Sequence, residues 1–158
     1  MTIENTLMRD LLREARGRKR EMVRLLGRFV RCESPSCDKA AVDRFGAMVA
    51  SEWRRRGAKV KILAQRLRGN HLRVEMAPRS GRVGGRGVRG GGWRGELTGD
   101  GQILVLGHLD TVYPLGTIRG MPFRVAGGKA WGPGTFDMKG GLVLALAAVD
   151  ALDRKRHV

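Results

Sequence analysis

The sequence predicts an α/β fold in which helices flank a mixed sheet. Three observations support this prediction. Apolar residues recur at helical spacing in the first third of the chain, short segments after it carry strand patterns, and an apolar segment at 139–154 follows a glycine-rich turn. Helices and strands in this succession are typical of a layered domain around one hydrophobic core. A length of 158 residues is enough for one such domain.

The N-terminal third is expected to form two helices. Residues 6–31 carry apolar residues at helical spacing, with Gly17 as a point where the helix can kink. This helix should end before Pro35, because proline disfavours helical conformation in the residue that precedes it. Residues 38–56 predict the second helix, with Asp38 as its N-cap.

The rest of the chain predicts strands and a last helix. Residues 59–63 and 72–76 alternate apolar and polar side chains, as half-buried strands do. Residues 103–106 are continuously apolar, which predicts a strand buried on both faces. A hairpin is expected at 125–131, turning at two glycines. The helix predicted at 139–154 is apolar nearly all round and should be buried.

The charge of the chain is strongly positive. Lysine and arginine number 31 against 15 aspartates and glutamates, which gives a formal net charge of +16. Such a charge attracts polyanions but says nothing about the fold. Residues 79–101 are rich in arginine and glycine and are expected to form a flexible loop. The alternative function is therefore a basic nucleic-acid-binding protein that uses this segment. However, the segment has one aromatic residue, Trp93, and so little surface for stacking on bases, and we do not expect nucleic acid as a partner.

Cysteine content and hydropathy indicate a cytoplasmic protein. The two cysteines, Cys32 and Cys37, do not form a disulfide framework and fit a reducing compartment. The first residues lack the apolar core of a signal peptide. The longest apolar run, 142–149, is far shorter than the ~20 residues that span a bilayer, so no membrane contact is expected.

Two motifs carry the chemistry, at 107–112 and 132–141. His108 and Asp110 directly follow the apolar run and project to the same side of an extended segment. Asp110 is therefore placed to hold the ring of His108, as carboxylates do behind metal-bound histidines. Asp137 lies between a turn of glycine and proline and the last helix. Taken singly, the first pair also fits a capped turn and Asp137 a helix N-cap. Together, in turns shaped by glycine, they favour a metal site.

These motifs resemble the two signature segments of the dizinc aminoacylase/carboxypeptidase family, which includes acetylornithine deacetylase, succinyl-diaminopimelate desuccinylase and glutamate carboxypeptidase. The sequence at residues 111–113 and 122–125 is most similar to the glutamate carboxypeptidase branch. Residues 33–36, 57–60 and 69–72 fit the opening of the same family. The resemblance implies a three-layer zinc-peptidase-like catalytic domain.

The resemblance also implies roles for the motif residues. His108 would bind one zinc ion, Asp137 would bridge two zinc ions, and Asp110 would orient His108. The family hydrolyses amide bonds next to a free carboxylate, in N-acyl amino acids, small peptides or C-terminal glutamate. A metal-activated water attacks the carbonyl, and a glutamate acts as general base.

Several parts of the family's site have no counterpart in this sequence. The general-base glutamate, the remaining ligands and the lid or dimerisation domain would all follow the last helix. Asp150 cannot replace them, because thirteen residues of helix place it ~20 Å from Asp137. His71 reads as an ordinary strand-edge histidine. Residues 1–158 are thus expected to be an inactive N-terminal part of the catalytic domain, from an interrupted gene or from one half of a split enzyme. The apolar edge left by the absent strands would favour a homo-oligomer.

Overall fold

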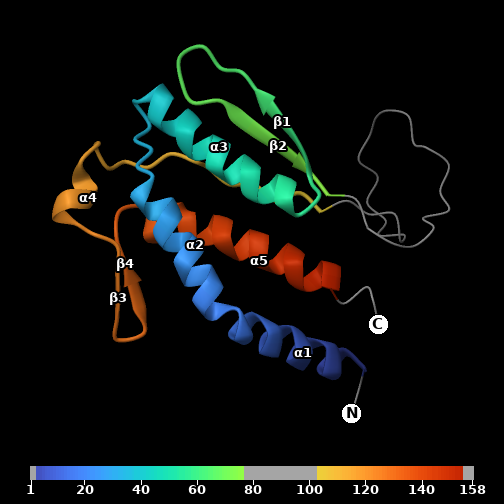
Figure 1. The fold of residues 1–158 in the computed structure, drawn as a ribbon. Coiled ribbons are helices and arrows are strands. Elements are labelled where there is room, and N and C mark those ends of the chain that lie inside the picture. Colours follow the sequence, from blue (N-terminus) through green and yellow to red (C-terminus); the bar gives the residue numbers. More distant parts are fainter. Residues whose placement is uncertain (1–2, 77–102, 155–158) are drawn as a thin grey trace, which may run out of the picture.

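The structure is a computed structural model that describes residues 3–76 and 103–154. The loop predicted at 79–101, and with it the nucleic-acid alternative, lies outside the described residues. Four long helices dominate the described part (Figure 1): α1 (Ile3–Gly17), α2 (Lys19–Arg31), α3 (Lys39–Arg55) and α5 (Gly140–Arg154). In the described part of the chain, no helix is long and apolar enough to cross a membrane.

The helix predicted at 6–31 is present as two helices that meet after Gly17. Backbone hydrogen bonds continue across the junction, from Arg18 N–H to the Glu14 carbonyl and from Met22 N–H to the Arg18 carbonyl. The second predicted helix is confirmed as α3. Its N-cap is Asp38, whose carboxylate accepts a hydrogen bond of 2.9 Å from the Ala41 amide.

The strands form two separate antiparallel pairs. The strand β1 (Lys59–Leu63) pairs with β2 (His71–Glu75), close to the predicted bounds, and this pair packs on α3 (Figure 1). The strands β3 (Arg124–Ala126) and β4 (Lys129–Trp131) confirm the predicted hairpin. A short helix that the sequence did not suggest, α4 (Thr117–Gly120), precedes them. The combination of helices and short strands confirms the α/β class, although the described strands form two antiparallel pairs and not one mixed sheet.

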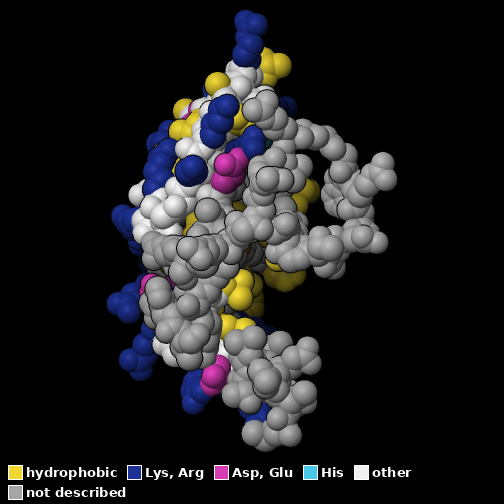
Figure 2. Space-filling view, turned by 90° about the vertical axis from the view of Figure 1, so that its right-hand side faces the viewer, with side chains coloured by type: hydrophobic (Ala, Val, Ile, Leu, Met, Phe, Trp, Pro, Cys, Tyr) yellow, Lys and Arg dark blue, Asp and Glu magenta, His cyan; other side chains and the backbone are white. Residues whose placement is uncertain are grey.

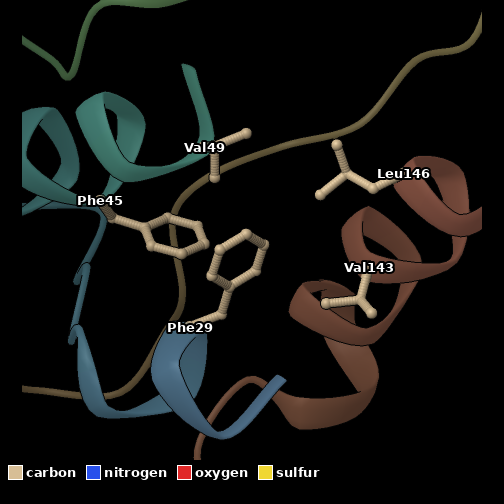
Figure 3. Packing of buried hydrophobic residues seen from close by; sticks show 5 residues of the cluster. All are labelled: Phe29, Phe45, Val49, Val143 and Leu146. Atoms are coloured by element: carbon tan, nitrogen blue, oxygen red, sulfur yellow. The ribbon is translucent and has the colours of Figure 1, made fainter. Parts of the chain in front are cut away.

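Residues from α2, α3 and α5 make up the hydrophobic core (Figure 3). Phe29 and Phe45 meet edge to face, with ring centroids 5.2 Å apart and an interplanar angle of 88°. Val49, Val143 and Leu146 complete this cluster, and none of the five is more than 3% exposed. Burial of each such side chain stabilises the fold by roughly 1.5–3 kcal/mol. The core therefore joins the N-terminal helices to the last helix.

The predicted strand at 103–106 is wrong for the described part of the chain. Residues 103–106 form no strand there, and their side chains are 72–88% exposed. A strand exists only where a neighbour pairs with its backbone, and none of the described strands pairs with residues 103–106.

The prediction that α5 is buried on all sides is also wrong. Val143 and Leu146 are buried, whereas Leu144 and Leu152 are 60% and 58% exposed. The helices α1 and α2 pack against α5, and the apolar residues on its other side lie open within the described structure. Apolar residues thus occur on both the packed and the open side of the helix.

A group of ion pairs connects the N-terminal helices to the far end of α5. The Asp150 carboxylate accepts from the Arg18 guanidinium at 2.8 Å and lies 2.9 Å from that of Arg56. Arg56 also pairs with Glu52 on α3. Asp150 is therefore engaged in holding α5 to α2 and α3.

Candidate metal site

The segment that carries His108 is held by the turn that follows α2. Pro35 and Thr111 form an isolated parallel β-bridge. Thr111 N–H donates to the Ser34 carbonyl at 2.8 Å, and the buried Ser34 hydroxyl donates to the Leu109 carbonyl at 2.8 Å. These bonds are made by residues 75 to 77 positions apart in the chain, so the N-terminal turn fixes the backbone on both sides of Asp110.

The segment that carries Asp137 is shaped by glycines. Gly134 has a φ of +68°, and a Cβ there would meet the Thr111 side chain at 2.5 Å. The wide helical turn η1 (Thr135–Lys139) follows, and within it Asp137 and Met138 have non-helical backbone angles. A Cβ at Gly140 would lie 2.7 Å from the Thr135 carbonyl oxygen. Side chains at these two glycines would prevent the close approach that brings Asp137 toward the His108 segment.

The two segments bring His108 and Asp137 together. His108 Nε2 lies 2.8 Å from Asp137 Oδ1. On the other side of the ring, Nδ1 lies 2.9 Å from the Asp110 carbonyl oxygen and 3.4 Å from Asp110 Oδ1. The nearer partner of the ring is thus the backbone of Asp110, with its carboxylate behind. Both Asp110 contacts suit an Nδ1–H, which leaves Nε2 to face the Asp137 carboxylate.

Neighbouring groups shift the pKa values of His108 and Asp110 in opposite directions. The hydrogen bond to Asp137 raises the pKa of the imidazole, although burial opposes this. A hydrogen bond from Ser36 holds the pKa of the Asp110 carboxyl below its usual value, again against the effect of burial. At 2.8 Å, His108 Nε2 and Asp137 Oδ1 are at hydrogen-bond distance, with a proton on Nε2 that a metal ion could replace.

A cavity of about 460 Å³ lies in front of this group. Its polar lining includes His108, Asp110 and Asp137, and its apolar lining includes Trp131 and Phe136. Phe136 is 97% exposed, so its ring forms an open wall of the cavity. The volume falls in the range of roughly 300–1,000 Å³ that is common for small-molecule sites.

The donor set suits part of a zinc site. Imidazole nitrogen and carboxylate oxygen are both zinc ligands, but a stable site takes three or four protein ligands. Among residues 3–76 and 103–154, no group of three or more His, Cys, Asp or Glu side chains could hold a metal ion. His71 lies exposed on β2, and Asp150 pairs with arginines at the opposite end of α5. The zinc-ligand and orienting roles of His108, Asp110 and Asp137 therefore remain predictions.

Sequence reasoning missed the groups that support this site. Lys139 is 2% exposed and its ammonium donates to backbone carbonyls of α2; burial lowers its pKa to about 8. Met138 Sδ accepts a hydrogen bond of 3.2 Å from the His108 amide. Glu33 accepts from two amides of the α4 segment. The one usable signal was that the motif at 132–141 contains a single lysine, directly before an apolar helix.

Comparison with known proteins finds a family resemblance in the last third of the chain, which includes His108, Asp110 and Asp137. Residues 104–158 match the model of the peptidase family M20/M25/M40. A stretch of 60 residues is 43% identical to carboxypeptidase G2 of Pseudomonas sp. (strain RS-16). That stretch covers 37% of this chain and 14% of the length of the relative.

Proposed function

Because residues 104–158 carry the sequence of the M20/M25/M40 peptidase family, we propose that this chain supplies the first part of the active site of a zinc-dependent metallopeptidase. The observation that carries the proposal is the 2.8 Å approach of His108 Nε2 to Asp137 Oδ1 at the wall of a cavity. Both residues lie within the matched stretch, and they come from segments that are 29 positions apart in the sequence.

The three motif residues have separate tasks in this proposal. His108 would hold zinc through Nε2, and Asp137 would contribute its carboxylate, a group that is able to serve two zinc ions. The Asp110 carbonyl and carboxylate keep the proton on Nδ1, so that the lone pair of Nε2 points to the metal. Zinc, when bound, would polarise the substrate carbonyl and acidify water.

We propose a small peptide or an N-acyl amino acid as substrate, cleaved at the amide bond next to a free carboxylate. The name of the relative, a carboxypeptidase, supports this class. The cavity supports it as well, because its apolar wall at Trp131 and Phe136 can cover an acyl group beside the polar residues. Residues 1–158 would be the N-terminal part of the catalytic domain, and the general base and further ligands would come from sequence outside this chain.

Zinc titration of the purified chain tests the ligand roles. We expect weak binding, because two protein ligands fall short of the three or four of a tight site. His108→Ala and Asp137→Ala should abolish the binding, whereas His71→Ala, on the exposed face of β2, should leave it unchanged. Competition with a chromophoric chelator measures all four proteins under the same conditions. Binding that survives His108→Ala would contradict the assignment.

An activity assay tests the incompleteness of the site. The chain alone should release no glutamate from an N-acyl glutamate at any zinc concentration, because no described residue is placed to act as the general base. Zinc-dependent release that disappears in the Asp137→Ala variant would overturn this expectation and would show that the chain is a complete enzyme.

A further inference from the structure

A buried ammonium group lies directly behind the candidate metal site. Lys139 is 2% exposed, and its Nζ donates to the Phe29 carbonyl at 3.0 Å and to the Cys32 carbonyl at 2.7 Å. Its third side faces the ring of Phe45, whose centroid is 4.4 Å away. Within the described structure, no carboxylate forms an ion pair with it. This lysine is therefore held by carbonyl dipoles and an aromatic face.

The two carbonyls belong to the last turn and the C-cap of α2. Carbonyl groups at a helix C-terminus carry partial negative charge and so favour a cation, and that of Phe29 also accepts the amide of Cys32. Phe45 extends the same pocket into the core, where it packs on Phe29. The ammonium thus has a socket that is built by the end of α2 and by the hydrophobic core.

The chain that leads to this socket carries the proposed metal ligand. Asp137 precedes Lys139 by two residues, and its own side chain is 80% exposed. The backbone between them is not helical. The amide of Lys139 donates to the Gly134 carbonyl at 3.0 Å, which closes a short loop around Asp137. Met138 lies between the two residues, with its methyl group against Gly107 and Gly141.

We propose that Lys139 is a positioning residue of the metal site: by seating its ammonium on the C-terminus of α2, it fixes Asp137 opposite His108. This inference rests on the proposed function, because it assigns the role through Asp137. It differs from a general contribution to stability. A stabilising contact anywhere in the fold would raise the unfolding free energy, whereas this contact also sets the geometry of one loop.

The experiment compares Lys139→Met with Arg56→Met. Each change removes a largely buried cation and leaves an unbranched apolar side chain, but Arg56 contacts Glu52 and Asp150, away from the cavity. Two measurements are made on each folded variant. The first is the zinc dissociation constant, followed through the His108 ring resonances in NMR. The second is the position and width of the Met138 methyl resonance without metal, assigned with Met138→Leu.

We expect Lys139→Met to weaken zinc binding tenfold to a hundredfold, the range seen when groups behind metal ligands are removed. Its Met138 methyl resonance should shift and broaden. Arg56→Met should lower the melting temperature while both site measurements stay at wild-type values. Equal changes in the two variants, or an unchanged Met138 methyl in Lys139→Met, would overturn the proposal.

The two measurements separate this inference from the function on which it rests. If the wild-type chain binds no zinc, the proposed function fails, and the metal-free methyl measurement still decides the role of Lys139. If Lys139→Met does not fold, Lys139→Gln is measured in its place, since its amide can still donate to one carbonyl. We expect Lys139→Gln to change the zinc dissociation constant and the Met138 methyl resonance in the same direction, but by less. Failure of both variants to fold would assign Lys139 to folding and contradict a positioning role.

Discussion

Glu33 shows how a single carboxylate organises a segment far from it in the sequence. Its Oε2 accepts a hydrogen bond of 2.8 Å from the Gly116 amide, and its Oε1 accepts one of 2.9 Å from the Ile118 amide. Gly116 has a φ of +90°, a conformation that favours glycine. One side chain at the end of α2 thus fixes the start of α4, which follows the His108 segment.

These two amides make the contribution of Glu33 depend on pH. Burial raises the pKa of its carboxyl group, but the amides of Gly116 and Ile118 outweigh it and hold the pKa below the ordinary value of 4.5. The folded state therefore favours the ionised form. The resulting stability is fully present above pH 4.5 and is lost as the pH falls through the folded-state pKa.

We predict that Glu33→Gln lowers the free energy of unfolding at pH 7 by about 1 kcal/mol, because an amide replaces a charge-assisted acceptor. The difference from wild type should shrink as the pH falls below the pKa of Glu33. Urea denaturation at a series of pH values measures both. A loss of the same size at pH 7 and at the acid end of the series would contradict the prediction.

At the scale of single residues, the sequence predicted the candidate site residues, whose polar side chains are exposed. His108, Asp110 and Asp137 stand out because glycine and proline surround them in an otherwise apolar context. Lys139 and Glu33 could not be found in the same way, because their partners are backbone groups of distant segments. A backbone carbonyl has no signature in the sequence, so a side chain that binds it leaves a pattern only when the fold is known.

At the level of elements, local patterns predicted α2, α3, the strands β1 and β2, and the β3–β4 hairpin. Each of these forms from neighbours in the sequence. The segment 103–106 and the outer side of α5 behave differently, because their apolar residues need partners from elsewhere. Leu104, at 74%, and Leu144, at 60%, are exposed in the described structure. The pattern indicated that these residues make apolar contacts, but it could not show which residues they contact.

These open apolar residues should make the chain associate with itself. We predict that Leu144→Lys lowers the apparent mass at high protein concentration, because a charge replaces an exposed apolar side chain. The melting temperature should change little. Sedimentation velocity over a range of concentrations gives the mass, and circular dichroism gives the melting temperature.

Val143→Lys is the matched control for this change. Val143 is adjacent in the sequence but 3% exposed, so a charge there should unfold the chain. If Leu144→Lys instead leaves the association unchanged, the exposed side of α5 is not the surface that associates.

Across the whole molecule, positive charge is the dominant property. Figure 2 shows Lys and Arg side chains along one flank of the described surface, with few Asp and Glu among them. At a net charge of +16 the folded state is opposed by self-repulsion. Ion pairs such as Arg18–Asp150, with side chains 14% and 16% exposed, are screened much less than exposed charges.

We therefore predict that salt stabilises this protein. The melting temperature should rise as NaCl increases from about 0.01 M to about 0.1 M, where the Debye length falls from about 30 Å to about 10 Å. Differential scanning fluorimetry measures the rise, and sucrose at equal osmolality serves as the uncharged control. A melting temperature that falls with NaCl would show that surface ion pairs outweigh the repulsion.

The parallel bridge between Pro35 and Thr111 has a consequence for where this molecule can be divided. The family match begins at residue 104, and a division there would seem natural from sequence alone. Three sets of contacts nevertheless join residues 29–36 to residues beyond that point. They are the bridge, the hydrogen bonds that Glu33 accepts, and the hydrogen bond from Lys139 to the Phe29 carbonyl. A peptide of 104–158 would keep the motifs at 107–112 and 132–141 but lose the residues that hold those motifs in place. The stretch that matches the family is thus shorter than the set of segments that shape the candidate site.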